Sequence, residues 1–227
     1  MTVPSGIVTY DSVPLPLTLH TSDGIALEAE VRLPDPDAVV EEPVTGAVVL
    51  AHPHPLQGGS MTSLVTSELF RLLPLRGIGV VRFNFRGVGK SEGEHGDGRA
   101  ESLDITAAID ALIPLWPQHP LVLCGWSFGA DVSLSMTDDR LDGWVGIAPP
   151  LRILPREEIS AAAGADSRPK LLIIPEHDQF LVPEAAAEAT KDWTNTRLET
   201  IKGGDHFLVG RTDKAARLVA SFLTELA

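Results

Sequence analysis

The stretch that most constrains this fold runs from Leu121 to Ala130, with the sequence Leu-Val-Leu-Cys-Gly-Trp-Ser-Phe-Gly-Ala. Its first half is apolar, which predicts a buried strand, and a helical pattern begins around Gly129. A serine in the turn between such a strand and helix needs glycine on both sides, here Gly125 and Gly129, because a side chain at either position would collide with the adjoining strand or helix. We therefore expect Ser127 at the apex of a strand–turn–helix unit.

This unit makes Ser127 a candidate nucleophile. A helix that starts after the serine directs its first N–H groups and the positive end of its dipole toward the place where negative charge develops during attack on a carbonyl. The N–H of Phe128, directly after the serine, is the first predicted donor of an oxyanion hole. A chance Gly-x-Ser-x-Gly in an ordinary turn is the alternative, and the flanking strand and helix favour the nucleophile.

Eight apolar or alternating runs predict strands, and helical patterns separate most of them. The first two runs are joined by Thr-Ser-Asp-Gly, which predicts an antiparallel hairpin. The strands are expected at 15–20, 25–33, 46–51, 78–85, before Gly125, and at 143–148, 170–175 and 196–201. Besides the helix after Ser127, helices are expected at 61–75, 101–116, 156–163, 183–193 and 212–226. This alternation favours a mostly parallel sheet covered by helices on both faces.

The motif at Ser127 and this order of elements resemble the α/β-hydrolase superfamily over nearly the whole chain. The sequence His-Pro-His-Pro-Leu-Gln-Gly-Gly at 52–59 resembles the subgroup that carries His-Pro-His-Pro in place of His-Gly, dienelactone-hydrolase-like or serine-aminopeptidase-like. The resemblance implies one α/β-hydrolase domain over residues 1–227, with an eight-stranded, mostly parallel sheet, an antiparallel N-terminal hairpin and helices on both faces. No cap domain is expected, because 149–169 holds room for only one short helix.

The resemblance also implies that the loop at 52–59 supplies the second oxyanion donor. Pro53 and Pro55 have no N–H and cannot donate. We assign the donor to the backbone N–H of His54, with Leu56 and Gln57 as the alternatives.

Two predicted strands end in candidate catalytic groups, at the sheet edge where ligands bind in open α/β folds. After the last strand, Gly-Gly-Asp-His-Phe has flexible glycines that let the loop return toward Ser127, which favours His206 as the base. The sequence Pro-Glu-His-Asp-Gln-Phe-Leu-Val-Pro resembles the superfamily's acid loop, and its proline spacing selects Asp178, with Glu176 as the alternative. His206 would take the serine proton while Asp178 orients the imidazole ring.

Three aromatic residues flank these groups: Trp126, Phe180 and Phe207. We predict that they bind substrate, with simple packing as an equal alternative. The remaining histidines are interpreted as structural or exposed; they are His20, His95, His119 and His177.

Two other patterns are not assigned chemistry. His52 and His54 lack the further ligands that a metal site needs, so we expect no metal and interpret His52 as a hydrogen-bonding core residue that holds its loop. Residues 86–91 imitate a phosphate-binding loop, but Asn84 stands where that pattern requires glycine, and the acidic residues beyond would repel phosphates. They resemble instead the Arg-Gly-x-Gly-x-Ser loop of the superfamily, and the acidic loop that follows is expected to be a solvated surface.

Composition narrows the partners. A formal net charge of -13 argues against nucleic acid and anionic membranes, which attract clustered basic residues, and favours small-molecule partners. The only cysteine, Cys124, allows no intramolecular disulfide, which fits a reducing compartment. The first ten residues lack a signal-peptide pattern and no apolar run approaches a membrane span, so we expect a soluble, cytoplasmic protein. The acidic, proline-rich stretch at 34–43 predicts a solvated loop.

These features predict a serine hydrolase that cleaves an ester or related acyl bond without a metal or organic cofactor, and a carboxylesterase for small substrates. A thioesterase, a peptidase and a non-catalytic ligand-binding protein are the alternatives. Without a cap over the site, we expect kcat/KM to stop rising beyond short acyl chains. The sequence leaves the substrate and the oligomeric state open.

Overall fold

The computed structural model describes residues 13–34, 46–116 and 118–227. The first ten residues lie outside these ranges, as do Pro117, the predicted end of a helix, and nearly all of the loop expected at 34–43.

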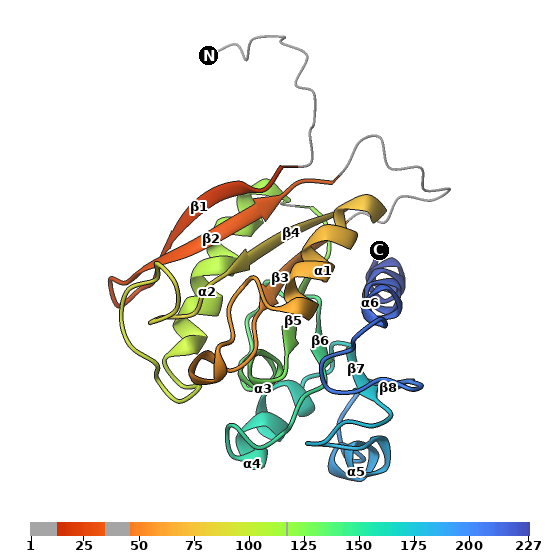
Figure 1. Cartoon of the computed structure of the whole chain (residues 1–227). Coiled ribbons are helices and arrows are strands. Elements are labelled where there is room, and N and C mark those ends of the chain that lie inside the picture. Colours follow the sequence, from red (N-terminus) through yellow and green to blue (C-terminus); the bar gives the residue numbers. More distant parts are fainter. Residues whose placement is uncertain (1–12, 35–45, 117) are drawn as a thin grey trace.

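Within the described residues the strands form one eight-stranded sheet (Figure 1). The strands are β1 (Leu15–His20), β2 (Ala26–Arg32), β3 (Gly46–Ala51), β4 (Ile78–Phe83), β5 (Leu121–Trp126), β6 (Gly143–Ile147), β7 (Lys170–Pro175) and β8 (Thr196–Ile201). Their order is β1-β2-β4-β3-β5-β6-β7-β8. The β1–β2 and β2–β4 pairs are antiparallel and all other pairs are parallel, which confirms the predicted fold class.

The helices are α1 (Leu64–Leu72), α2 (Glu101–Leu112), α3 (Phe128–Leu134), α4 (Arg156–Ile159), α5 (Pro183–Ala189) and α6 (Thr212–Leu226). Two end earlier than predicted because a proline-containing 3-10 turn follows each: Pro74–Arg76 after α1 and Ile113–Leu115, with Pro114, after α2. The helix α1 also begins at Leu64 and not at residue 61. The helix predicted to Trp193 ends at Ala189, where Thr190 leaves the helical region with φ −118°.

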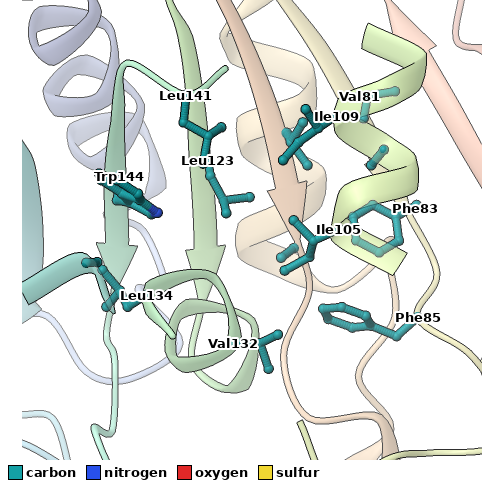
Figure 2. Packing of buried hydrophobic residues seen from close by; sticks show 14 of the residues in the cluster. Val81, Phe83, Phe85, Ile105, Ile109, Leu123, Val132, Leu134, Leu141 and Trp144 are labelled. Carbon is teal, nitrogen blue, oxygen red and sulfur yellow. The ribbon is translucent and has the colours of Figure 1, made fainter. Parts of the chain in front are cut away.

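Helices cover both faces of the sheet, so the central strands are buried on both sides and consist of continuous apolar runs. On one face α2 and α3 pack against alternate strand residues such as Phe83, Leu123 and Trp144 (Figure 2). On the other face α1 and α6 pack against the intervening residues such as Val80 and Val122 (Figure 1). Each fully buried aliphatic or aromatic side chain stabilises this core by about 1.5–3 kcal/mol.

The carboxyl ends of the parallel strands lie at one edge of the sheet, where the loops after β3, β5, β7 and β8 meet. Between β6 and β7 the chain forms only α4 and the π-helical turn Ser160–Gly164, so no cap domain is inserted there. In the described part of the chain, no helix is both long enough and apolar enough to cross a membrane.

Candidate active site

The turn between β5 and α3 holds Ser127 in a strained conformation, with φ 56° and ψ −120°. Neither flanking glycine has room for a side chain. A Cβ would lie 2.2 Å from the Gly129 carbonyl oxygen if added at Gly125, and 2.4 Å from the Ala51 carbonyl oxygen if added at Gly129. The Ser127 N–H donates to the Ile147 carbonyl oxygen at 2.9 Å, which ties the turn to β6. The sheet therefore fixes the position of the serine.

Three side chains from separate loops form a hydrogen-bonded chain. Ser127 Oγ lies 2.9 Å from His206 Nε2, and His206 Nδ1 lies 2.8 Å from Asp178 Oδ2. Asp178 Oδ1 accepts the N–H groups of Phe180 at 2.7 Å and Leu181 at 3.3 Å, which orient the carboxylate. Because the carboxylate accepts a hydrogen bond from the Nδ1–H group, Nε2 is unprotonated and can accept the serine hydroxyl proton. The structure thus brings together the three residues that the sequence selected.

The alternative acid, Glu176, has a different partner. Its side chain is 43% exposed and its Oε2 accepts the Gly203 N–H at 2.7 Å. Its other close group is His177, whose Nε2 lies 3.8 Å away. Glu176 therefore braces the loop that carries His206 and does not contact the imidazole.

The two predicted oxyanion donors lie at the start of α3 and in the loop after β3. Within the described residues, neither the Phe128 N–H nor the His54 N–H has a hydrogen-bond acceptor. The alternatives are occupied, since the Leu56 N–H donates to His54 Nδ1 at 3.3 Å and the Gln57 N–H donates to the His54 carbonyl oxygen at 3.0 Å. The rings of His54 and Phe128 pack with centroids 4.9 Å apart, so the two donor segments are in contact.

His52 holds the loop after β3, as predicted. It is completely buried; its Nε2 accepts the Phe85 N–H at 3.0 Å and its Nδ1 donates to the Pro53 carbonyl oxygen at 2.6 Å. Burial lowers the pKa of His52 to about 4, so the ring is neutral at pH 7. Across the described residues, no group of three or more His, Cys, Asp or Glu side chains could hold a metal ion.

A cleft of about 300 Å³ lies beside Ser127, and Trp126, Phe180 and Phe207 all border it. Trp126 also has a structural role, because its Nε1–H donates to the His206 carbonyl oxygen at 3.0 Å. The Phe180 ring lies 4.5 Å from the His206 ring, and Phe207 is 49% exposed. These aromatic residues therefore both pack against the catalytic loop and line the cleft.

A larger hollow of about 670 Å³ lies at the opposite end of the strands, beside the first residue of β5, Leu121. None of the described residues that border it is serine, threonine or cysteine. Because it offers no nucleophile, the smaller cleft at Ser127 is the candidate active site.

Asp131, a residue that the sequence pattern did not single out, anchors α3. Its carboxylate is completely buried and accepts the N–H groups of Leu151 at 2.9 Å, Arg152 at 2.8 Å and Ile153 at 2.9 Å. Burial raises the pKa of Asp131 to about 6. The available signal was a charged residue in a mostly apolar helix, four residues after the nucleophile.

The acidic loop after β4 is only partly the solvated surface that the sequence predicted. Glu92, Glu94 and Asp97 are exposed, but His95 points inward because its Nδ1 lies 2.8 Å from Glu101 Oε1. Glu101 is completely buried and accepts the N–H groups of two loop glycines. The loop is therefore held against α2 by a buried carboxylate.

Arg86 and Ser91, at the ends of the Arg-Gly-x-Gly-x-Ser loop, are scaffold residues. The buried Arg86 guanidinium lies 2.7 Å from Asp104 Oδ1 and 3.0 Å from Asp23 Oδ2. Ser91 Oγ donates to the Asn84 carbonyl oxygen at 2.7 Å. Both side chains hold the loop and neither borders the cleft.

A family model described as serine aminopeptidase, S33, matches residues 42–165, more than half of the chain. This match includes the loop after β3 and the serine turn, and ends before Asp178 and His206. Among curated proteins, an uncharacterized protein of Rickettsia prowazekii is 28% identical over 204 residues, covering 86% of this chain and 85% of that protein.

Solved structures with the same architecture cover almost the entire chain. A lidless α/β serine hydrolase from Xanthomonas campestris is 28% identical, covers 93% of this chain and 94% of its own, and has a TM-score of 0.79. An α/β serine hydrolase homologue from Coxiella burnetii is 27% identical, covers 92% and 97%, and has a TM-score of 0.78.

Proposed function

Since the chain belongs to the serine aminopeptidase S33 family and is a hydrolase of the α/β serine hydrolase type, we propose that it cleaves an ester or related acyl bond through an acyl-serine intermediate. The observation that carries the proposal is the chain of contacts from Ser127 Oγ through His206 to Asp178. We further propose that residues 1–227 act as one catalytic domain and that its preferred substrates are small carboxylic esters.

In the first half of the reaction, His206 Nε2 accepts the Ser127 proton as Oγ bonds to the substrate carbonyl carbon. Negative charge develops on the carbonyl oxygen, which the N–H groups of Phe128 and His54 stabilise; losing one such donor typically costs ~10²–10³ in rate. The carbon–oxygen bond to the alcohol then breaks, and His206 delivers its proton to the leaving oxygen.

In the second half, water attacks the acyl-serine and His206 accepts a proton from that water. The bond to Ser127 Oγ breaks, the proton returns to the serine, and the carboxylic acid leaves. Asp178 keeps the imidazole in the required tautomer and stabilises the imidazolium in both halves. These steps use only groups of this chain and water.

Labelling with a fluorophosphonate probe tests the nucleophile. We expect the native protein to be labelled at Ser127 and Ser127→Ala to remain unlabelled. Failure of the native protein to label would favour a ligand-binding protein on the same fold.

The family description favours peptide bonds as an alternative target, and thioesters use related chemistry. Matched esters, thioesters and aminoacyl anilides would separate these activities, and we expect the highest kcat/KM for the esters. A p-nitrophenyl ester series from acetate upward tests the expectation that kcat/KM stops rising beyond short acyl chains.

A further inference from the structure

The cleft beside Ser127 differs in charge from the chain as a whole. The chain has a formal net charge of -13, and 22% of its residues are charged. Of the described residues that border the cleft, none is Asp, Glu, Lys or Arg. Apart from the catalytic residues and His54, its polar side chains are Gln57, Ser63 and Gln179. The cleft therefore offers hydrogen bonds and no opposite charge.

The carboxylates directly beside the catalytic residues in the sequence do not border the cleft. Asp178 lies behind His206 and its oxygens accept the imidazole and two backbone N–H groups. Asp205 precedes His206, but its Oδ1 accepts the Phe207 N–H at 3.1 Å and its side chain does not border the cleft. A substrate ammonium would thus lose water without gaining an ionic partner.

A cationic side chain, that of Arg152, lies near the site but outside the lining of the cleft. Its guanidinium carbon lies 4.9 Å from the centroid of the Phe180 ring, and Arg152 does not border the cleft. Phe180 borders the cleft and contacts this cation, whereas Arg152 is not part of the lining. A substrate carboxylate in the cleft would likewise lack a direct ionic partner.

Apolar side chains complete the cleft. Leu64 at the start of α1 is 44% exposed and Phe207 is 49% exposed, and both border the cleft beside Trp126 and Phe180. These side chains come from four segments: the end of β5, the start of α1 and the loops after β7 and β8. Because their exposed area lies directly beside the nucleophile, the group that covers it is the acyl or alcohol part of a substrate.

We propose, resting on the hydrolase function above, that this site selects substrates whose acyl group in the cleft is uncharged and apolar. A free ammonium or carboxylate in the same position is disfavoured because its desolvation is not compensated. Gln57 and Gln179 determine this specificity, since they place neutral amides where a carboxylate would bind an ammonium.

Three p-nitrophenyl esters test the selection: 6,6-dimethylheptanoate, its isosteric cation 5-(trimethylammonio)pentanoate, and hydrogen adipate. We expect kcat/KM for the neutral ester to exceed that for each charged ester by about tenfold or more. Measurement near 0.15 M salt screens the net charge of the protein. An equal or higher kcat/KM for a charged ester overturns the proposal while leaving the hydrolase function intact.

Gln179→Glu places a carboxylate in the cleft with almost no change in shape. We expect the ratio of kcat/KM for the cationic ester to that for the neutral ester to rise about fivefold. The ratio cancels any effect of the new charge on His206. Gln118→Glu is the matched control, because the exposed Gln118 borders the hollow at the opposite end of the strands, and its ratio should change less than twofold. Equal changes in both variants overturn the assignment to Gln179.

A binding measurement keeps this proposal separate from the hydrolase function. Ser127→Ala is titrated with 6,6-dimethylheptanamide and with 5-(trimethylammonio)pentanamide, and chemical shifts of the cleft residues are followed by NMR. Tighter binding of the uncharged amide supports the selection even if no ester is hydrolysed, in which case only the proposed reaction fails. Equal or tighter binding of the cation overturns the selection.

Discussion

Among the described residues, two histidines lie 2.8 Å from a carboxylate that is almost completely buried, and only one of them faces a nucleophile. His206 Nδ1 lies 2.8 Å from Asp178 Oδ2, and His95 Nδ1 lies 2.8 Å from Glu101 Oε1. Both carboxylates are nearly inaccessible and both accept two backbone N–H groups. The pairs are therefore alike in separation, burial and support.

The pairs differ in alignment and in the group beyond the imidazole. The Asp178–His206 contact is a hydrogen bond, whereas His95 Nδ1 has no hydrogen-bond partner among the described residues despite the same separation. His206 Nε2 contacts Ser127 Oγ, while His95 Nε2 lies 3.6 Å from the exposed Asp97. A buried histidine beside a carboxylate thus does not by itself define a catalytic site; the strained serine and the cleft beside it do.

The largest expected effect on kcat comes from removing Ser127 or His206, the nucleophile and the histidine that contacts it. Ser127→Ala and His206→Ala should each lower kcat by roughly 10⁵–10⁶, and the double variant should be little worse because the residues act as a unit. Steady-state kinetics with a p-nitrophenyl ester measures all three. Losses that multiply in the double variant would contradict a shared mechanism.

Asp178→Asn should lower kcat by about 10⁴, because an amide in this position favours the wrong imidazole tautomer. Glu176→Gln is the matched control from the same loop, and its kcat should stay within about twofold, because this carboxylate contacts Gly203. The same ester assay checks both variants. The reverse result would assign the orienting carboxylate to Glu176.

A third buried histidine, His52, has no carboxylate partner and extends the comparison to stability. Burial lowers its pKa from 6.5 to about 4, so the folded state binds fewer protons than the unfolded state between these values. The contribution of His52 to the free energy of unfolding should therefore fall as pH falls through this window, by roughly 2 kcal/mol at pH 4.5. Urea unfolding at pH 7 and pH 4.5 measures the change.

His52→Gln isolates this contribution, because its side-chain oxygen can accept the Phe85 N–H without titrating. Asp131 acts in the opposite sense: its pKa is raised to about 6, so its contribution to stability falls as pH rises from about 4 to 6. The contribution of Asp131 is the same in wild type and His52→Gln, so it cancels when their pH-dependent changes in unfolding free energy are subtracted. An equal acid-induced loss in wild type and His52→Gln would exclude His52 as the cause.

The smallest effect is expected at the second pair. Glu101→Gln should lower the free energy of unfolding by about 1–3 kcal/mol, because Gly96 and Gly98 donate to separate oxygens and an amide offers only one acceptor atom. His95→Ala should lower kcat by no more than about tenfold, through lost packing against His54 and Phe128. Urea unfolding and ester kinetics test these values. A kcat loss above 10³ with unchanged stability would make this pair catalytic.

The sequence by itself determined the serine turn and the three candidate catalytic residues. Gly125 and Gly129 mark the turn because the close backbone contacts exclude any side chain, and this constraint is local. The strands and the helices between them could also be predicted from local sequence, because burial of one or both faces of an element produces a short-range pattern of apolar residues. Asp178 and His206 could be named because each follows a recognisable strand and because these loops resemble those of the α/β-hydrolase superfamily.

Only the tertiary structure decided which groups meet. It placed Asp178, and not Glu176, against His206. Among the described residues it left the His54 N–H without an acceptor, whereas the N–H groups of Leu56 and Gln57 both have one. It also placed His95 beside Glu101. It also set the strand order, which brings together loops such as those of Ser127 and His206, 79 residues apart. These contacts depend on which strands pair in the sheet, although they are far apart in the sequence. The residue types within a short window do not determine that pairing.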